Sequence, residues 1–509
     1  MKPFLSLLLF GLIGFSKAQS PSYNLTFNPK NYVVQTLTHE GKTFKVRAYE
    51  NLVYVKNPVD TAYQKMNIYI PEEYFMGKSI HGYTAKTVPI FFPNKVGGYM
   101  PALPGTTKDN PMGNMPPING GIQPTNAPRP EGMPSIGLAS PKPLTIVVAL
   151  SKGYIVASAG ARGRTSKDKN SIYTGKAPAG LVDLKAAIRY LKFNDKKMPG
   201  NANKIISNGT SAGGAMSALL GATGNNPDYE PYLEALGAAK AKDDVFAVSA
   251  YCPITNLDHA DMAYEWQFNG INAYKKGGPM AGNNPQASSL NEKQIEVSAQ
   301  LKDLFPAYLN SLKLKDTHGN LLTLESDGNG NFKDWVKSYV IASAQKALDD
   351  GTDLSSFTFL TILNGKVTQI DYDAYIRYME RQKTPPAFDA LDLSSAENML
   401  FGTATTDKQH FTDFSTNNST LAATTADKKI VKMMNPMNYI GQPNTTTSKH
   451  WRIRHGAKDK DTGLAISVIL ATQLQNKGYH VNLALPWGKP HSGDYDLKEL
   501  FEWIDGICK

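Results

Sequence analysis

The sequence predicts an α/β fold with a mostly parallel central sheet and a large inserted segment. From Leu144 onward, short apolar runs rich in β-branched residues alternate with amphipathic helical segments. This alternation is typical of a parallel sheet with helices on both faces. It stops near residue 257 and resumes near residue 435. Because one core rarely organises a chain of 509 residues, the interruption favours a main domain with an insertion.

The first eighteen residues, MKPFLSLLLFGLIGFSKA, have the anatomy of a signal peptide. Lys2 precedes an apolar stretch, and small residues follow at Ser16 and Ala18. We expect cleavage before Gln19 and export to a periplasm or to the medium. The apolar stretch is too short to cross a bilayer, and no later stretch reaches the roughly 18 apolar residues that a spanning helix needs. We therefore expect no association with a membrane.

The charge of the chain is weak evidence for any charged partner. The formal net charge is +10, and removal of Lys2 and Lys17 with the leader lowers it to +8. Lysines are scattered rather than clustered, which favours a solvated basic surface over nucleic-acid binding. The two cysteines, Cys252 and Cys508, do not have the spacing of a metal site or of a disulfide framework.

Three extended runs are predicted near the start of the mature chain. KTFKVRAY (42–49), NIYIPEEY (67–74) and TVPIFFPN (87–94) are rich in β-branched and aromatic residues, so each is expected to be a strand. The segment 101–143 that follows is crowded with Pro, Gly, Asn and Met and has no period. It is expected to be an ordered surface loop or a mobile flap, and its role stays open.

The next part of the chain carries the first strand–helix alternation. LTIVVALSK (144–152) is compatible with a strand or with a helix that covers the sheet. After it we expect, in order, strand GYIVAS (153–158), helix GLVDLKAAIRYLKFN (180–194), strand KIISN (204–208), helix GAMSALLGA (214–222) and strand VFAVSAYCP (245–253).

The inserted segment has helical patterns of its own. They cover residues 291–312, 332–348 and 372–382, and a hairpin is expected around DGNGN (327–331). The sheet pattern then resumes with strands HWRIRHG (450–456) and VNLALPW (481–487) and helices at 464–478 and 497–507. We expect a signal peptide at 1–18, a core formed by 19–256 and 435–509, and a lid domain at 257–434.

A candidate nucleophile lies between the strand KIISN and the helix that follows. Gly209-Thr210-Ser211-Ala212-Gly213 fits the pattern G-x-S-x-G, in which small neighbours allow a strained turn to lift a serine hydroxyl out of the sheet. Glycine is common in this chain, so the pattern alone is weak evidence.

Ser211 needs a base and a group that orients the base, because a serine hydroxyl is hardly ionised at neutral pH. In an α/β-hydrolase fold the partners follow in the order Ser, acid, His, on loops after later strands. Asp459 and Asp461 follow the strand HWRIR, and His491 follows the strand VNLALPW. These loops end at the edge of the sheet where the serine lies. A turn aspartate and an ordinary loop histidine are the structural alternatives.

The predicted chemistry is acyl transfer to water. His491 would take the proton of Ser211, and Asp459 would hold and stabilise the imidazolium. The oxyanion needs two preorganised N–H donors. One is the N–H of Ala212, and the other is expected from Gly98, with Gly97 as the close alternative. A plain tight turn is the structural alternative for this Gly-Gly pair.

Longer motifs resemble one family. GTSAGG, GYIVASAGARGR, DLKAAIRYLKFN, HGAKDKD and PHSGDYD together look like the bacterial tannases, α/β hydrolases that cleave galloyl esters. The resemblance extends from the KTFKVRAY strand to the C-terminus, except for much of the segment 101–143.

The resemblance implies the site residues. The family's triad falls on Ser211, Asp459 and His491, and the three residues that bind gallate hydroxyls fall on Lys383, Glu397 and Asp461. Without the resemblance, Lys383 and Glu397 would be interpreted as solvated lid charges. Two carboxylates and an ammonium suit a ring with three adjacent hydroxyls, because charge-assisted hydrogen bonds are strong.

The sequence therefore predicts an exported serine esterase that hydrolyses galloyl ester, and possible depside, bonds of tannins and needs no cofactor or metal. Two alternatives remain open. The first is a feruloyl esterase, another carboxylesterase or a peptidase of the same fold, and the second is a non-catalytic protein that binds polyphenols. The oligomeric state and the preferred leaving group are not predicted.

Other features are given structural interpretations. Asp327–Asn331 resembles the start of a calcium loop, but position 12 is Ser338 instead of Glu. Asp258, His259 and Asp261 lack a further strong ligand set and are expected at the surface near the lid. Cys252 ends a strand at the active-site edge, whereas Cys508 ends a helix that runs roughly 20 Å away from that edge, so no disulfide between them is expected.

Overall fold

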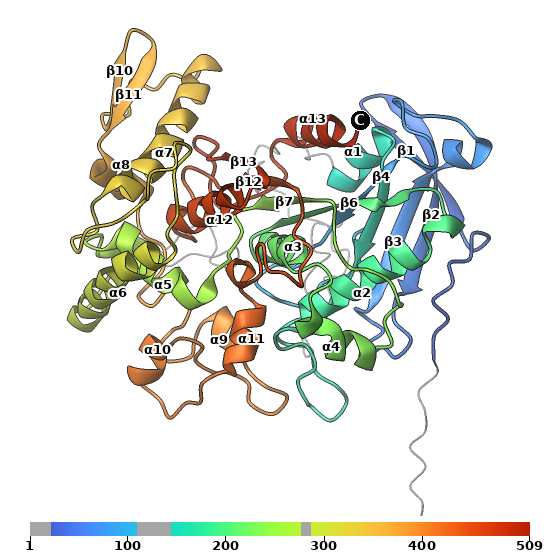
Figure 1. The fold of residues 1–509 in the computed structure, drawn as a ribbon, viewed down its shortest axis with the longest axis horizontal. Helices are drawn as coiled ribbons and strands as arrows, with labels where there is room; N and C mark the ends of the chain where they lie inside the picture. Colours follow the sequence, from blue (N-terminus) through green and yellow to red (C-terminus); the bar gives the residue numbers. More distant parts are fainter. Residues whose placement is uncertain (1–21, 109–143, 276–286) are drawn as a thin grey trace, which may run out of the picture.

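The computed structural model describes residues 22–108, 144–275 and 287–509 of the chain. The predicted signal peptide and most of the segment 101–143 lie outside the described residues. A nine-stranded sheet forms the centre of the molecule, with helices on both faces and an inserted segment beside one end (Figure 1). The predicted α/β class with a mostly parallel sheet is confirmed.

The sheet begins with antiparallel strands and continues with parallel ones. The pairs β1–β2, β2–β3 and β3–β5 are antiparallel, and all later pairs are parallel. In spatial order the strands are β1 (Val33–His39), β2 (Lys42–Val53), β3 (Lys65–Pro71), β5 (Ile155–Ala159), β4 (Pro89–Pro93), β6 (Asn201–Thr210), β7 (Ala247–Tyr251), β12 (His450–Arg454) and β13 (His480–Ala484).

The register of the parallel strands determines where functional loops can meet. Thr210 of β6 and Arg454 of β12 both pair with Tyr251 of β7, and Arg454 also pairs with Ala484 of β13. These four residues are the last of their strands, so the strands end in one row. The loops that follow therefore leave the sheet side by side at its carboxyl edge, where open α/β sheets bind ligands.

Helices cover the two faces of the sheet. Helices α1 and α13 lie on one face, and α2 and α3 lie on the other (Figure 1). The helices of the core are α1 (Thr145–Ser151), α2 (Ala179–Phe193), α3 (Ala212–Ala222), α4 (Glu230–Ala235), α12 (Leu464–Asn476) and α13 (Leu497–Cys508), with short 3-10 turns at Glu72–Met76, Asp195–Lys197, Pro227–Tyr229 and Pro436–Asn438.

The ambiguous run LTIVVALSK is helix α1. It buries Ile146, Ala149 and Leu150, and a turn at Gly153 with φ +85° leads directly into β5. The structure also differs from the sequence prediction at two other points. The strand predicted over NIYIPEEY ends at Pro71 and continues as a 3-10 turn, and β1 was not predicted because its outer face is largely exposed.

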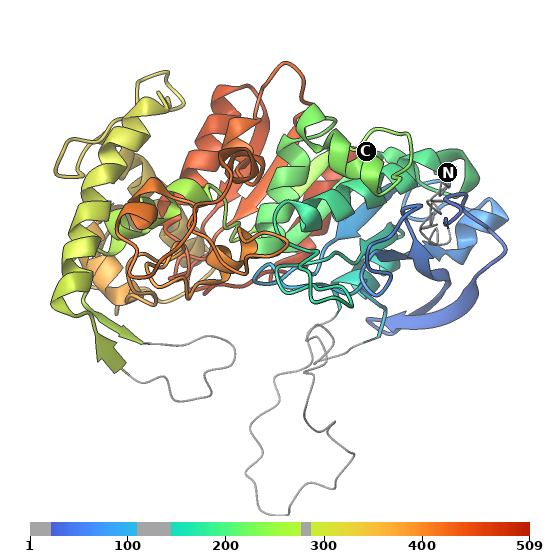
Figure 2. The ribbon, with the colours of Figure 1, turned by 90° about the horizontal axis from the view of Figure 1, so that it is seen from below.

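The inserted segment leaves the sheet after β7 and returns at β12. It lies beside the end of the sheet formed by β12 and β13, opposite the N-terminal strands, and Figure 2 shows the same arrangement at right angles. Its elements are α5 (Leu257–Phe268), β8 (Ala273–Lys275), β9 (Ala287–Ser289), α6 (Glu292–Ser311), α7 (Asn331–Asp349), β10 (Leu360–Leu363), β11 (Lys366–Ile370), α8 (Tyr372–Met379), α9 (Ala396–Leu400), α10 (Asp413–Asn417) and α11 (Lys428–Met433).

The nine-stranded sheet takes no strand from this segment, as far as the described residues show. Strands β7 and β12 pair directly, so the sheet is continuous across the insertion. The boundaries of a lid domain at 257–434 stay a prediction.

The hairpin predicted around DGNGN was wrong. Those residues form a turn in which the N–H of Glu325 donates to the carbonyl of Asn329, and helix α7 starts at Asn331. The hairpin of this region is β10–β11, which turns at Asn364 and Gly365. Both residues have positive φ, as an Asn-Gly hairpin turn requires.

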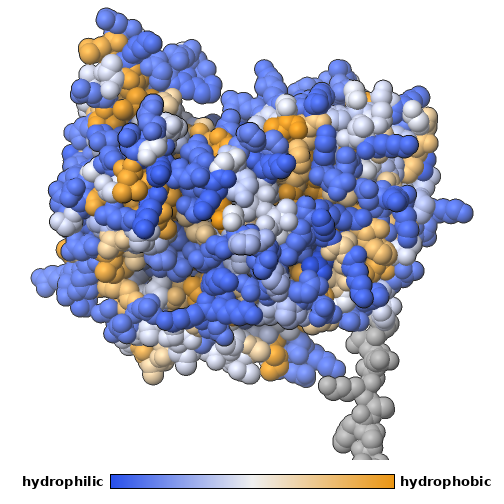
Figure 3. Space-filling model, viewed as in Figure 1, coloured by the Kyte–Doolittle hydropathy of each residue, from blue (hydrophilic) through white to orange (hydrophobic). Residues whose placement is uncertain are grey.

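The apolar core continues from the sheet into the inserted segment. The outer surface is mainly hydrophilic, with small, scattered apolar areas on the face seen in Figure 3. Among the described residues, no helix combines the length and the apolar character that a membrane span requires. Both cysteines are free thiols.

Candidate active site

Ser211 lies at a sharp turn between β6 and α3. Its backbone has φ +60° and ψ −124°, a conformation that non-glycine residues rarely adopt. The N–H of Ser211 donates to the carbonyl of Tyr251 at 2.9 Å, which ties the turn to the end of β7. Strained backbone of this kind, between a strand and a helix, is the geometry of a nucleophile elbow.

Gly213 is needed because the loop after β4 packs directly on the elbow. A Cβ at Gly213 would lie 2.7 Å from Asn94 Oδ1 and 2.8 Å from the carbonyl oxygen of Val96. Asn94 also donates from Nδ2 to the carbonyls of Asn208 and Gly213, at 3.2 and 3.0 Å. The loop that carries the predicted oxyanion donor is thus fixed against the predicted nucleophile.

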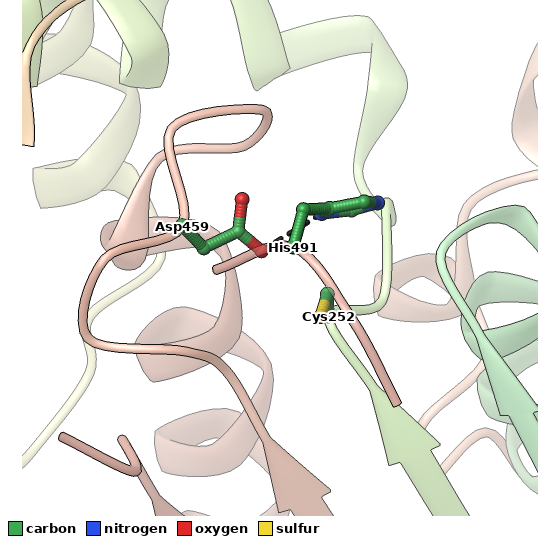
Figure 4. Close-up of side chains that lie close together, drawn as sticks. All are labelled: Cys252, Asp459 and His491. Carbon is green, nitrogen blue, oxygen red and sulfur yellow. Dashed lines mark hydrogen bonds and ion pairs between the residues drawn. The ribbon is translucent and has the colours of Figure 1, made fainter. Parts of the chain in front are cut away.

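Asp459 and His491 form a hydrogen-bonded pair, shown in Figure 4. His491 Nδ1 lies 2.8 Å from Asp459 Oδ2, and the other carboxylate oxygen accepts the N–H of Asp461 at 2.9 Å. Asp459 is fully buried. The carboxylate therefore holds one tautomer of the ring and leaves Nε2 available to exchange a proton.

The electrostatics of the pair favour an ion pair. Burial opposes ionisation of Asp459, but His455 and His491 outweigh it and lower the pKa of the carboxyl. Burial also opposes protonation of His491, but the Asp459 carboxylate outweighs it and raises the pKa of His491 well above its usual range. Burial lowers the pKa of His455 against the opposing effect of Asp459.

The loop with His491 passes directly against the elbow. A Cβ at Gly493 would overlap Thr210, the residue before Ser211, so only glycine fits there. Within the described residues, no hydrogen bond joins Ser211 Oγ to His491, and His491 Nε2 is buried without a hydrogen-bond partner. The predicted base and acid are thus in contact. Ser211 lies on the elbow that packs against the loop of His491.

Cys252 was not predicted as part of this site. It follows β7 and lies beside His491 (Figure 4). Its Sγ donates to the carbonyl of Ser492 at 3.0 Å. Cys252, Asp459 and His491 each offer one possible ligand atom, and these three atoms lie within 4.8 Å of one another. Such a spacing could hold a metal ion. The short His491–Asp459 hydrogen bond already satisfies Asp459, so we interpret the set as a proton-transfer pair with a neighbouring thiol.

The predicted oxyanion donors have different surroundings. Ala212 starts α3, so its N–H has no intrahelical acceptor. Gly98 has φ +52°, and its carbonyl accepts a hydrogen bond from Arg164 Nε at 2.8 Å. The cavity beside Ser211 is lined by Gly97 but not by Gly98. The choice between the two glycines stays a prediction.

The three residues expected to bind gallate hydroxyls lie together. Lys383 Nζ is 3.2 Å from Asp461 Oδ2, which is also 3.8 Å from His491 Nε2. Glu397, on α9, is buried, and burial raises the pKa of its carboxyl against the opposing effect of Lys383. Asp461 therefore lies between this cluster of charged residues and the Asp459–His491 pair.

Tyr264 of α5 fixes two of the loops that form the cluster. Its hydroxyl accepts the N–H groups of Gln382 and Lys383, at 3.2 and 3.1 Å, and donates to the carbonyl of Lys460 at 2.9 Å. Lys383 and Asp461 are thus held at a set separation by one buried phenol. Sequence reasoning missed this role because the three segments are far apart in the chain.

Beside the cluster, Arg381 and Glu265 form a fully buried ion pair, with Nη1 at 3.0 Å from Oε1.

The prediction that Asp261 lies at the surface was wrong. Asp261 is buried and accepts the N–H groups of Phe388 and Asp389, at 2.7 and 3.0 Å. Burial raises the pKa of Asp261 to about 8. Asp261 thus stabilises the backbone at residues 388–389 of the inserted segment.

A family model and a curated relative each match part of the chain. A family model described as BD-FAE matches residues 142–309, which include Ser211. The chain is 43% identical to "Esterase LipC" of Mycobacterium tuberculosis over 56 residues, which span 11% of this chain and 14% of that esterase.

Solved structures match almost the whole chain. A Fusobacterium nucleatum tannase is 50% identical, with coverage of 96% of this chain and 100% of that chain and a TM-score of 0.86. A tannin acyl hydrolase from Lactobacillus plantarum is 46% identical, with coverage of 95% and 99% and a TM-score of 0.86. A tannin acyl hydrolase in complex with ethyl gallate is 46% identical, with coverage of 95% and 99% and a TM-score of 0.85. At this identity over essentially the full length of both chains, the protein belongs to the bacterial tannases, carboxylic-ester hydrolases of the α/β-hydrolase fold.

Proposed function

We propose that this protein is an exported serine esterase that hydrolyses galloyl esters through Ser211, His491 and Asp459. The observation that carries the proposal is the position of Asp461, 3.2 Å from Lys383 and 3.8 Å from His491. A cluster suited to phenolic hydroxyls thereby adjoins a proton-transfer pair. Related tannin acyl hydrolases have been solved with ethyl gallate and with 3,4-dihydroxybenzoate, which supports a phenolic acyl group.

In the acylation step, Ser211 Oγ attacks the ester carbonyl carbon while His491 Nε2 takes the hydroxyl proton. Asp459 holds the ring through Nδ1 and stabilises the imidazolium that forms. The tetrahedral intermediate then collapses. The ester C–O bond breaks, and the leaving alcohol takes the proton back from Nε2, so a galloyl-Ser211 ester and a free alcohol result.

In deacylation, a water molecule attacks the carbonyl carbon of the galloyl-Ser211 ester. His491 takes a proton from the attacking water, and Ser211 leaves with that proton, so gallic acid is released. Both tetrahedral intermediates carry a negative oxygen, which the N–H of Ala212 and an N–H of the Gly97-Gly98 pair would stabilise. The chemistry needs only groups of this chain and water.

The acyl group is selected by matched hydrogen bonding. Glu397 and Asp461 would accept the phenolic O–H groups, and Lys383 would donate to their oxygens. An acyl ring without hydroxyls would leave the buried carboxyl of Glu397 without its hydrogen bonds to the ring, and Lys383 and Asp461 would keep only their mutual contact. Because unpaired buried polar groups are costly, discrimination between such analogues can reach about 10⁴.

Export is proposed from the sequence of residues 1–18 alone. The experiment is N-terminal sequencing of the protein expressed in a host with a general secretion pathway. We expect the mature chain to begin at Gln19 and to be recovered outside the cytoplasm. Recovery of an intact Met1 terminus in the cytoplasm would contradict export.

Ser211→Ala tests the nucleophile. We expect hydrolysis of methyl gallate to fall by a factor on the order of 10⁴ or more, because loss of a triad nucleophile removes most of the catalysis. Binding of gallate, measured by calorimetry, should be retained. Substantial turnover by the variant would refute the proposal, and Ser338→Ala is the matched control, because Ser338 is exposed on α7.

Lys383→Met and Glu397→Gln test the acyl specificity. We expect each change to reduce kcat/KM for methyl gallate at least tenfold more than for methyl benzoate, because methyl benzoate makes no hydroxyl contacts. Equal losses on the two esters would mean that these residues only support the lid. Lys498→Met is the control, since Lys498 is highly exposed on α13.

Methyl ferulate separates this function from the nearest alternative. A ferulate ring carries one free hydroxyl, so the cluster of Lys383, Glu397 and Asp461 would be incompletely paired. We expect much lower kcat/KM for methyl ferulate than for methyl gallate. Equal values would favour a feruloyl esterase.

A further inference from the structure

The turn that contains the Gly97-Gly98 pair has an unusual backbone. The N–H of Met100 donates to the carbonyl of Gly97 at 2.9 Å, and the two residues between them, Gly98 and Tyr99, have φ +52° and +56°. Two positive φ angles inside such a hydrogen-bonded turn are the signature of type I′. A left-handed φ is costly for a tyrosine. The turn is therefore strained at Tyr99.

The sequence of the turn favours a different form. In a type II′ turn only the first central residue has a positive φ, and glycine is preferred at that position. Gly98-Tyr99 matches this preference, because Tyr99 would then have a negative φ. The two forms differ by a rotation of the peptide between Gly98 and Tyr99 through roughly half a turn. An interaction from outside the turn must therefore hold this peptide in the strained form.

That interaction comes from Arg164. Its Nε donates to the carbonyl of Gly98 at 2.8 Å, and its backbone N–H donates to the carbonyl of Tyr99 at 2.8 Å. Rotation of the peptide would turn the Gly98 carbonyl away from the guanidinium and break the first of these hydrogen bonds. A hydrogen bond from a charged donor is stronger than one between neutral groups. The Arg164 side chain thus opposes the rotation.

The guanidinium is held from its other side by the inserted segment. Arg164 Nη1 donates to Met399 Sδ at 2.9 Å, on helix α9, which also carries Glu397. Burial lowers the pKa of Arg164, and the attraction of Glu397 opposes this effect. The same helix is fixed to the core, because Lys176 Nζ donates to the carbonyl of Met399 at 2.8 Å. Arg164 therefore joins the turn to the helix that carries Glu397.

The form of the turn decides which groups can face a negative oxygen. In the part of the chain that the structure describes, the N–H groups of Gly98 and Tyr99 donate no hydrogen bond. In type I′ these two N–H groups point to the same side, whereas in type II′ the carbonyl of the first central residue takes the place of the second N–H. A carbonyl oxygen on that side would repel an oxyanion that the N–H groups would stabilise. Gly97, at the start of the turn, lines a cavity together with Ser211.

We infer that Arg164 is a positioning residue of this esterase, which holds the turn Gly97–Met100 in the form that presents N–H groups to the oxyanion. The inference rests on the proposed function, because the oxyanion forms only when Ser211 attacks an ester. It also favours Gly98 over Gly97 as the second oxyanion donor, because the N–H of Gly98 lies within the turn.

Arg164→Ala tests this role with 4-nitrophenyl benzoate, whose ring has no hydroxyl to contact Glu397. We expect kcat to fall at least about tenfold with KM nearly unchanged, because an oxyanion donor acts in the transition state and loss of one costs about 10²–10³ in kcat. Two backbone hydrogen bonds of 2.9 Å between Ala161 and Ala102 keep the segment of Arg164 beside the turn. Arg377→Ala is the matched control, because Arg377 is exposed on α8. An unchanged kcat would overturn the inference.

A second substitution separates control of the turn from general support of the fold. Gly98→Asn permits type I′, because asparagine tolerates a left-handed φ, but it disfavours type II′, which prefers glycine at this position. The side chain fits, since a Cβ at Gly98 meets nothing within 4 Å. We expect the effect of Arg164→Ala on kcat to shrink to less than about threefold in the Gly98→Asn background, as for residues that no longer interact. Equal losses in both backgrounds would overturn the inference.

A third variant covers the possibility that Arg164→Ala fails to fold. Arg164→Met keeps the aliphatic part of the side chain and removes the donors, so kcat should fall as in Arg164→Ala. An unchanged kcat in this variant would overturn the inference. If the unmodified protein does not hydrolyse methyl gallate, or if Ser211→Ala hydrolyses it, the proposed function fails instead, so the two failures are distinguishable.

Discussion

Removal of the charge of Asp461 should move the acid limb of the activity profile to lower pH. His491 must be neutral to act as a base, so kcat/KM rises as the pH passes through the pKa of His491. Negative carboxylates raise the pKa of His491, and Asp461 is one of them, 3.8 Å from Nε2. Asp461→Asn therefore lowers this pKa.

The size of the shift follows from the distance. Two unit charges 3.8 Å apart interact by about 1 kcal/mol at the dielectric constant of water and about 4 kcal/mol at an effective value near 20. Lys383, 3.2 Å from the same carboxylate, offsets part of its field. We use the lower interaction energy, which corresponds to a decrease of about one unit in the pKa of His491. Loss of Asp461 also leaves the ammonium of Lys383 unopposed, which lowers the pKa of His491 further.

The assay follows release of benzoate from 4-nitrophenyl benzoate, whose unhydroxylated ring bypasses galloyl recognition. In the unmodified protein the acid limb should lie above the ordinary histidine pKa of about 6.5, because Asp459 raises it. In Asp461→Asn the limb should lie about one unit lower. Asp334→Asn, an exposed change on α7, is the control. An unchanged limb, or a limb at higher pH, would refute the electrostatic reasoning.

Three further changes test the support of the site. Tyr264→Phe removes the hydroxyl that fixes the loop of Lys383, so kcat/KM for methyl gallate should fall at least tenfold more than for methyl benzoate, with parallel losses as the contrary result. Gly213→Ala adds a methyl 2.7 Å from a side-chain oxygen of the loop after β4, so chemical denaturation should show a loss of about 2 kcal/mol, and an unchanged midpoint would contradict the crowding. Arg381→Met leaves Glu265 as an uncompensated buried charge, for which the unfolding free energy should fall by about 3–5 kcal/mol, whereas a change below about 1 kcal/mol would show that the carboxyl is readily neutralised.

The order of the catalytic loops could be predicted from sequence because strand periodicity is local. Once β12 and β13 are recognised as parallel strands, their following loops must reach the same edge of the sheet as Ser211. That rule predicted that Asp459 and His491 lie close together, and the two side chains are hydrogen bonded in the structure. The hairpin was misplaced because DGNGN was preferred to Asn364-Gly365, although the latter is the stronger two-residue turn signal.

The supporting residues could not be predicted in the same way. Tyr264 contacts loops more than a hundred residues away, and nothing in its local sequence distinguishes it from a core tyrosine. Lys383 and Glu397 were found only through family resemblance, because solvated lid charges have the same local pattern.

The direct pairing of β7 with β12 has a consequence for synthesis. The ribosome completes β7 long before β12, so during translation β7 is an open edge strand with an apolar sequence. Such an edge invites pairing with other chains until its native neighbour is available. The serine is likewise made well before the aspartate and the histidine, so no part of the nascent chain before β13 contains all three proposed catalytic residues.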